Sequence, residues 1–325
     1  MEFFHNVNVD WLGKKWYFLA FSLVFSAAGI ISMGYHWAHI GSPVPLGVDF
    51  RGGTQVTVQF QEPPDLTRIR QAIDAAGLRN ASISTFGEAK NDEVLVSLPE
   101  QANESALDTG RSQIENALHA HYGGEFHVRS VQVVGPTVGR QLERQAVLAT
   151  VYSMLGMLVY LWFRFQLIYG VAAVVACVHD TVITLGAFSL ASSFGRSDLE
   201  LSLTVIAAIL TLVGYSMNDT IVVFDRIREN LRLTRREPLP VLVNRSINQT
   251  LSRTVLTSGL TFLTVLSLFI FGGQVLKGFS FALVVGILIG TYSSIAVASP
   301  MLVAYQEWRA GRGKTAVLPA ARRAR

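Results

Sequence analysis

Asp219 is the residue of this sequence best suited to proton chemistry. It lies in an apolar stretch that begins at Leu201 and continues through residues 221–224. A carboxylate at the centre of a bilayer costs roughly 2.5–3.5 kcal/mol on insertion scales, so its presence there requires a function. A buried carboxylate that faces a cation can change its charge near neutral pH, which is the property of a proton carrier.

Arg253 is the cation that we predict to face Asp219. It stands at the start of another apolar segment and, apart from His179, is the only basic residue of the polar-striped segments. We therefore predict a proton relay of Asp219 and Arg253. The alternative is a helix that ends at Asn218 and leaves Asp219 at the headgroup boundary. Residues 221–224 favour burial, but this alternative stays open.

Polar or small side chains recur at helical spacing on three apolar segments. The members are Ala173, Cys177, Asp180, Thr181 and Thr184, beside His179, on the third segment; Thr204, Ala208, Thr211, Tyr215, Asn218 and Asp219 on the fourth; and Thr257, Thr261, Thr264 and Ser267 on the fifth. Such stripes must face protein or water, because lipid offers polar groups no hydrogen-bond partner. We expect auxiliary roles for these side chains and an obligate partner that covers them.

The sixth apolar segment has a small residue at every fourth position. These residues are Gly278, Ala282, Gly286, Gly290 and Ser294. The pattern allows two helices to approach closely. We predict that Gly214 and Gly259 make similar contacts on neighbouring helices.

The composition indicates a membrane protein. Half of the 325 residues are hydrophobic, 15% are charged, and the mean hydropathy is +0.37. Six stretches are long enough to cross a hydrocarbon core of about 30 Å as helices. They are residues 16–36, 145–163, 167–190, 201–224, 255–271 and 279–304.

The charge distribution predicts the topology. Residues 225–253 contain seven arginines and three acids, and residues 305–325 contain six basic residues and one acid. By the positive-inside rule both segments are cytoplasmic, as is the N-terminus (1–15), and the insert (37–140) lies outside. The basic surplus is better explained by this topology than by nucleic-acid binding.

The insert has the pattern of a small α+β domain. Alternating residues predict strands, and capped helical stretches separate them in the order βαββαβ, the ferredoxin-like arrangement. His119, His121 and His127 lie close together, but no carboxylate or cysteine completes a metal site, so we expect none.

The stretch GVDFRGGT begins this insert. Its central residues are Asp49, Phe50, Arg51, Gly52 and Gly53. It lacks the spacing of a phosphate-binding loop and precedes a strand rather than a helix. We therefore predict a structural turn.

Four stretches of the chain resemble SecF, the smaller subunit of the bacterial SecDF accessory translocase in the RND superfamily. They are VGYSMNDTIVVFDRIREN, LSRTVLTSGLTFLTVLSLFIFGG, VHDTVITLG and GVDFRGGT. The resemblance implies one RND-type half with six transmembrane helices and a ferredoxin-like periplasmic domain, set in the bacterial inner membrane. It also implies a transport role without catalysis.

The resemblance further implies a site and partners. The family's proton-carrying aspartate lies in an NDT motif, here Asn218, Asp219 and Thr220, and its arginine matches Arg253. His179 and Asp180 fall in a family motif as structural or auxiliary residues. The implied partners are SecD, SecYEG, SecA, a YajC-like small subunit and unfolded preproteins. No cofactor is implied; the coupling ion is H⁺, with Na⁺ left open.

Three other functions remain as alternatives. Asp180 and Asp219 would form the dyad of an intramembrane aspartyl protease, although the GxGD signature is absent and residues 214–219 read GYSMND. An RND-type exporter would share the proton relay, but the outer domain leaves little room for a drug-binding cleft. In a scaffolding subunit, Asp219 and Arg253 would be a structural ion pair.

Overall fold

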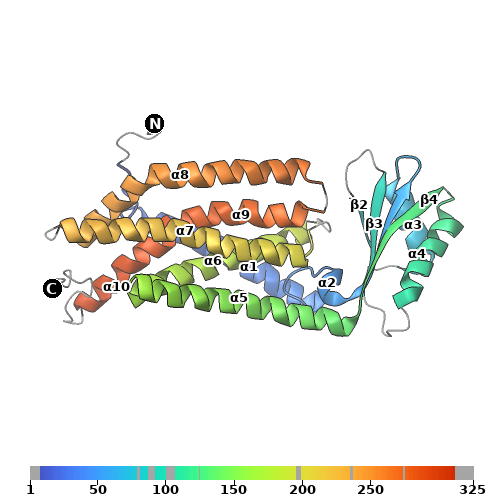
Figure 1. The fold of residues 1–325 in the computed structure, drawn as a ribbon, viewed down its shortest axis with the longest axis horizontal. Helices are drawn as coiled ribbons and strands as arrows, with labels where there is room; N and C mark the ends of the chain where they lie inside the picture. Colours follow the sequence, from blue (N-terminus) through green and yellow to red (C-terminus); the bar gives the residue numbers. More distant parts are fainter. Residues whose placement is uncertain are drawn as a thin grey trace.

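The structure is a computed structural model in which a long helical bundle carries a small α/β domain at one end (Figure 1). It describes residues 8–78, 81–86, 92–99, 107–123, 125–194, 199–234, 237–273 and 275–311. The site predicted in the membrane and most of the outer domain fall within these ranges. The final part of the predicted basic tail, from residue 312, lies outside them.

The bundle contains six helices of membrane-spanning length and composition within the described ranges, which confirms the six predicted segments. Five of them are α1 (Lys15–Ile40), α5 (Pro136–Arg164), α6 (Leu167–Ser193), α7 (Leu203–Leu233) and α8 (Leu239–Phe271). The sixth consists of α9 (Lys277–Ser293), the π-helix η3 (Ser294–Ala298) and α10 (Ser299–Gly311).

Most of the helices are longer than the apolar segments predicted. The basic stretch 225–253, expected as a loop, is mainly helical, because α7 continues to Leu233 and α8 already begins at Leu239. Likewise α5 begins at Pro136, inside the range expected for the outer domain. Hydropathy detects only the part of a helix that is apolar, whereas the backbone hydrogen bonds continue through polar residues of good helix propensity.

The outer domain has the predicted βαββαβ order. Its elements are β1 (Gly53–Phe60), α3 (Leu66–Ala75), β2 (Ser82–Phe86), β3 (Glu93–Pro99), α4 (Leu107–His121) and β4 (Phe126–Val134). The antiparallel sheet has the strand order β2-β3-β1-β4. Asp65 caps α3 by accepting from the backbone N–H of Thr67 at 2.8 Å. The ferredoxin-like prediction is therefore confirmed.

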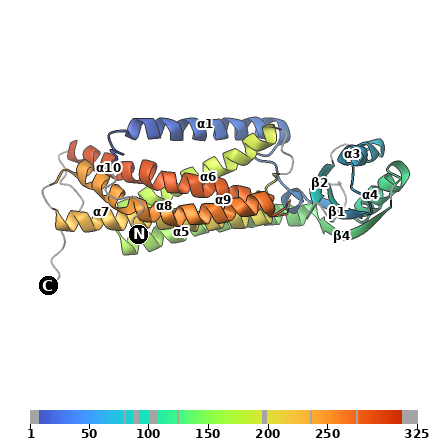
Figure 2. The ribbon, with the colours of Figure 1, turned by 90° about the horizontal axis from the view of Figure 1, so that it is seen from above.

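The two faces of the sheet differ in chemistry. Val56, Val96 and Ile114 belong to a core between the sheet and its two helices. The other face carries polar side chains such as Gln55, whose amide donates to Ser97 at 3.1 Å. This polar face is turned toward the helical bundle, as Figures 1 and 2 show. His119, His121 and His127 are exposed, and in the described ranges no cluster of three or more side chains is arranged to hold a metal ion.

Small residues allow α9 to pack closely on α7. A methyl group added at Gly290 would lie 2.9 Å from Cβ of Ser216, and one at Gly286 would lie 2.4 Å from the Leu212 side chain. At Gly278 the nearest atom would be Val205 Cγ2, again at 2.9 Å. These distances agree with the predicted packing role of the small-residue stripe.

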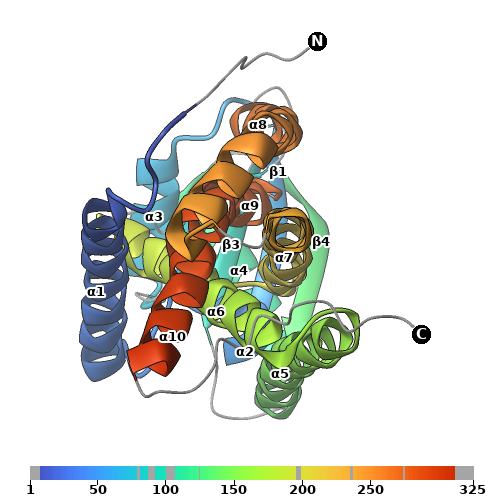
Figure 3. The same ribbon diagram turned by 90° about the vertical axis from the view of Figure 1, so that its left-hand side faces the viewer.

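The other predicted glycine contacts are looser. Gly214 has only an ordinary contact with Met157 at 3.9 Å, and nothing lies within 4 Å of a methyl group added at Gly259, so the prediction for Gly259 was wrong. Instead, α1 meets α6 through Gly29 and Gly186, whose backbones approach too closely for a Cβ. Viewed end-on in Figure 3, α6 and α9 lie near the centre of the bundle and α1, α5 and α8 lie around them.

We predict that Gly290→Val destabilises the bundle by roughly 1–3 kcal/mol, because the added side chain forces α9 away from α7. Thermal unfolding in detergent measures the effect. Gly259→Val is the matched control and is expected to leave the midpoint unchanged, since open space surrounds that position. Equal midpoints for the two variants would contradict close α7–α9 packing.

Candidate functional site

Asp219 lies inside the bundle where α7, α8 and α9 meet. Its side chain is 3% exposed. One carboxylate oxygen, Oδ2, accepts from Ser258 Oγ on α8 at 2.7 Å and from Thr291 Oγ1 on α9 at 3.4 Å. Because α7 continues to Leu233, the alternative in which the helix ends at Asn218 is wrong. Asp219 is therefore a buried carboxylate held by neutral hydroxyl donors.

Arg253 does not form the predicted ion pair with Asp219 in this structure. Its side chain is exposed, and no ion pair of the described residues within 4 Å joins it to Asp219. It lies in the middle of α8, close enough for its charge to act on Asp219 at longer range. The contact expected from charge pairing is occupied instead by the Ser258 hydroxyl.

Asp180 is the second carboxylate of the bundle and is still more buried, at 1% exposed. It accepts from Ser216 Oγ on α7 at 2.5 Å and from Ser293 Oγ on α9 at 2.7 Å. His179 Nδ1 lies 3.0 Å from its other oxygen. The three contacts satisfy a carboxylate that would otherwise be strongly destabilised at this depth.

The same two helices therefore serve both carboxylates. Helix α7 supplies Asp219 itself and the hydroxyl of Ser216, and α9 supplies Thr291 to one carboxylate and Ser293 to the other. Directly after Ser293 the chain forms the π-helix η3. Such helices often occur at functional sites, and here the irregular turn adjoins both carboxylate clusters.

The auxiliary polar residues divide between the inside and the outside of the bundle, and those of α6, such as Asp180 and Thr184, are buried. On α7, Asn218 and Thr211 are exposed while Asp219 and Thr220 are buried. On α8, Thr257 and Thr261 bond the carbonyls of Arg253 and Thr257, four residues earlier, at 3.0 and 2.9 Å. Hydroxyl bonding to the same helix satisfies a threonine without a partner helix, so polarity alone did not identify the inward face.

Asn218 opens onto a groove between α5 and α7. The groove has a volume of about 490 Å³, and its lining includes Ser153, Gly156 and Gly214. Tyr215 is nearby on α7, and its buried hydroxyl has no hydrogen-bond partner in the described structure. The polar outer side of α7 is thus separate from the Asp219 site.

The motif of Asp49–Gly53 connects the outer domain to α7. It forms one helical turn, α2 (Val48–Arg51), followed by Gly52 and Gly53 at φ 77° and 130°, values that favour glycine. Asp49 Oδ2 accepts from the backbone N–H of Leu203 at 2.9 Å, and its Oδ1 accepts from Gln132 of β4 at 3.3 Å. Phe50 is buried in the adjoining core. The expected turn therefore also caps the helix that carries Asp219.

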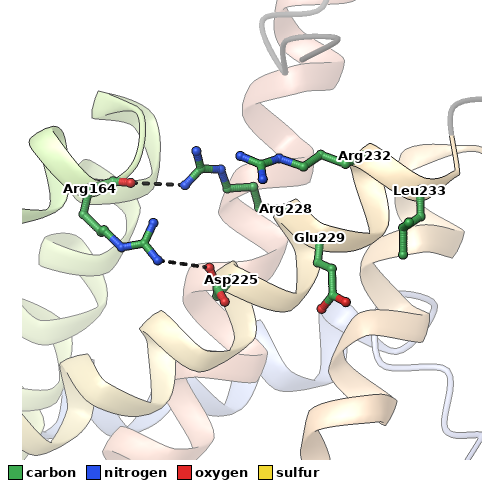
Figure 4. A pocket seen from close by; sticks show the side chains of 6 residues that line it. All are labelled: Arg164, Asp225, Arg228, Glu229, Arg232 and Leu233. Carbon is green, nitrogen blue, oxygen red and sulfur yellow. Dashed lines mark hydrogen bonds and ion pairs between the residues drawn. The ribbon is translucent and has the colours of Figure 1, made fainter. Parts of the chain in front are cut away.

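Asp225 lies at the opposite end of α7 in a polar pocket of about 300 Å³ (Figure 4). It pairs with Arg164 of α5 at 3.8 Å, and Arg228 donates to the backbone carbonyl of Arg164 at 3.2 Å. Both Asp225 and Arg164 are more than half exposed. Asp225 thus belongs to a solvated charge cluster and needs no role inside the membrane.

Comparisons with known proteins agree with this fold. Residues 113–308 match the family model of the protein export membrane protein SecD/SecF, C-terminal, and residues 40–64 match the SecD/SecF GG motif. The second match covers the motif that caps α7. These features define a protein-export membrane protein of the SecD/SecF type.

Similar proteins distinguish between the SecD and SecF subunits. Protein translocase subunit SecF of Koribacter versatilis is 52% identical over 98% of this chain and 96% of its own length. That of Desulfurispirillum indicum is 45% identical over 91% of both. The chain belongs to the SecF family of protein translocase subunits, and its role is in protein translocation.

Solved structures of SecDF have the same fold. The crystal structure of SecDF from Thermus thermophilus, a translocon-associated membrane protein, matches with a TM-score of 0.77 and 38% identity over 93% of this chain. A super-membrane-facing form of SecDF matches with a TM-score of 0.70. The chain spans 39% and 40% of the length of these two SecDF chains.

We predict that Ser258→Ala destabilises the protein by about 1–3 kcal/mol, because it removes a donor from a buried carboxylate. Thr257→Ala is the matched control, since that hydroxyl bonds its own helix. Unfolding in mixed detergent micelles compares the two. An equal loss of stability in both variants would contradict the assignment of Ser258 as the partner of Asp219.

Proposed function

We propose that this chain is the SecF half of a proton-driven SecDF machine that helps pull preproteins through SecYEG. The observation that supports this most is the position of Asp219, which is buried at a junction of three helices and held only through neutral hydroxyls in the described structure. A carboxylate in this setting can accept a proton without breaking a short ion pair. Protonation removes its charge and changes what holds the three helices together.

The proton gradient supplies enough energy for such a change. Moving one elementary charge through the membrane field is worth about 2.3 kcal/mol per 100 mV. The hydrogen bonds of Asp219 and Asp180 both involve residues at the end of α9, next to η3. The start of α7, at Leu203, is capped by Asp49 of the motif that leads into the outer domain. If protonation shifts α7 relative to α9, the shift would therefore reach the outer domain through the start of α7.

The proposed partners rest on membership of the SecF family and on the polar groups at the surface of the bundle. We propose SecD as the obligate partner, because the matched SecDF chains are more than twice as long and polar groups of α7 and α8 face outward. SecYEG, SecA, a YajC-like small subunit and unfolded preproteins complete the proposed assembly. Location in the bacterial inner membrane with both termini inside accords with the distribution of arginines.

We predict that Asp219→Asn abolishes gradient-dependent translocation of a preprotein into inverted vesicles. The amide keeps the shape of the side chain but cannot carry a proton. Asp225→Asn on the same helix is the matched control and is expected to retain activity, because Asp225 is exposed. Unchanged stimulation by an imposed gradient in Asp219→Asn vesicles would overturn the proposal.

Asp180→Asn separates proton coupling from proteolysis. A carrier that depends on Asp219 is expected to tolerate this change far better than Asp219→Asn, whereas a protease dyad would lose cleavage equally with either variant. Preprotein translocation and cleavage of a transmembrane reporter are measured side by side. Cleavage that depends equally on both aspartates would favour the protease.

A charge-neutral double replacement tests the scaffolding alternative. Asp219→Asn combined with Arg253→Gln keeps the net charge and removes both ends of the long-range pair. We predict loss of gradient-dependent translocation with retained complex assembly, measured by co-purification with SecD. A double variant that translocates normally would indicate a structural role for both residues.

A further inference from the structure

Glu200 lies at the contact between the helical bundle and the outer domain, in the connection from α6 to α7. Its backbone neighbour Leu201 pairs with the segment before α2: Leu201 N–H donates to Pro45 at 2.7 Å, and Gly47 N–H donates to Leu201 at 2.9 Å. Asp49, two residues after Gly47, accepts from the backbone N–H of Leu203 at the start of α7. The start of α7 is therefore held by the outer domain through backbone and side chain.

The Glu200 side chain extends this contact to the sheet. Ser82, the first residue of edge strand β2, hydrogen-bonds the Glu200 carboxylate, and the charge of Arg51 acts on it. Oε2 of Glu200 lies 3.7 Å from where a Cβ on Gly47 would stand. Glu200 thus bridges α7, the motif and β2.

A cavity of about 460 Å³ surrounds this bridge. It lies between the polar face of the sheet and the first turns of α7 and α9, and its lining includes Asp49, Ser82, Gln132, Glu200 and Gly278. The cavity leaves part of this contact unpacked, and Glu200 is a side chain that reaches from the bundle to the edge of the sheet there. A contact that encloses such a space buries less apolar surface, which lowers the free energy needed to open it.

We propose that Glu200 is a protonatable positioning residue, which holds the outer domain against the start of α7 when it is neutral and releases it when it is ionised. The inference goes beyond the proposed function, because it concerns the contact between two parts of this chain and its measurement requires no translocation. The start of α7 would then respond to protons outside the membrane independently of Asp219.

The sign of the effect follows from burial. Desolvation raises the pKa of Glu200 from 4.5 to about 6, although Arg51 and the Ser82 hydroxyl act in the opposite direction. A carboxyl group with a higher pKa in the packed state binds protons more tightly there, so acid favours packing and ionisation favours release. The shift from 4.5 to about 6 corresponds to a rise of roughly 30-fold in the release constant as the pH passes through this window.

Within the described ranges, few charged groups lie around Glu200. Asp49 and Arg51 face it from the motif, and Lys277 starts α9 beside Gly278, which packs near the Glu200 carbonyl. The neighbouring positions on β2, β4 and α7 that line the cavity, such as Ser82, Gln132 and Thr204, are uncharged. Among the described residues of this contact, titration of Glu200 is therefore the main charge change expected near pH 6.

The experiment measures the distance between the two parts of the chain as a function of pH. Spin labels are placed at exposed positions by Arg70→Cys on α3 and Phe194→Cys after α6, with Cys177→Ala removing the native thiol. The full chain, co-expressed with SecD, is studied in nanodiscs by pulsed electron resonance from pH 4.5 to pH 8. We expect one narrow distance distribution in acid that broadens or shifts with a midpoint near pH 6.

Two variants make the result specific to Glu200. Glu200→Gln, which stays neutral, is expected to keep the acid distribution up to pH 8. Ser82→Ala is expected to move the midpoint to higher pH, because a group that lowers the pKa is lost. Glu62→Gln, an exposed acid of the same domain, is the control and is expected to titrate like the native chain. A distribution that does not change with pH, or a Glu200→Gln protein that titrates normally, would overturn the proposal.

Discussion

The need to stabilise two carboxylates inside a helical bundle determines much of this structure. Asp180 and Asp219 are 1% and 3% exposed, and each requires donors that the hydrocarbon cannot supply. Most of those contacts are hydroxyl groups on α7, α8 and α9, and His179 Nδ1 adds one to Asp180. They reach the carboxylates only because the helices pack closely, and the glycines of α9 permit that approach. The hydrogen bonds to the two carboxylates therefore depend on the close packing of the helices.

The use of hydroxyls rather than a close cation gives the site its character. A tight ion pair would fix Asp219 in its charged form, and breaking it would leave an uncompensated charge at depth. Hydroxyl groups donate to a carboxylate and can accept from a carboxylic acid, so they serve both protonation states. The charge of Arg253 acts on Asp219 only from a distance in this structure. A site of this type is suited to repeated protonation and deprotonation.

Sequence patterns predicted those features that depend on local periodicity. The six spans, the βαββαβ order and the small-residue face of α9 follow from hydropathy, alternation and spacing, and the structure has all three. The partner of Asp219 was not predicted, because spacing shows which side chains share a face but not which face meets a neighbour. Arg253 was predicted as that partner instead, and Thr257 was placed on the polar stripe. In the structure Ser258, one residue and about 100° further around α8 than Thr257, donates to the carboxylate. The capping role of Asp49 was missed because it joins residues 154 positions apart in sequence.

If Asp219 carries protons, the flux of protons across the membrane depends on this residue. The chain and SecD are reconstituted together in liposomes that contain a pH-sensitive dye, and a pH gradient is imposed. We expect a flux above that of empty liposomes for the native complex, and a flux equal to that of empty liposomes for Asp219→Asn. Equal flux in the native and Asp219→Asn complexes would show that Asp219 does not carry protons.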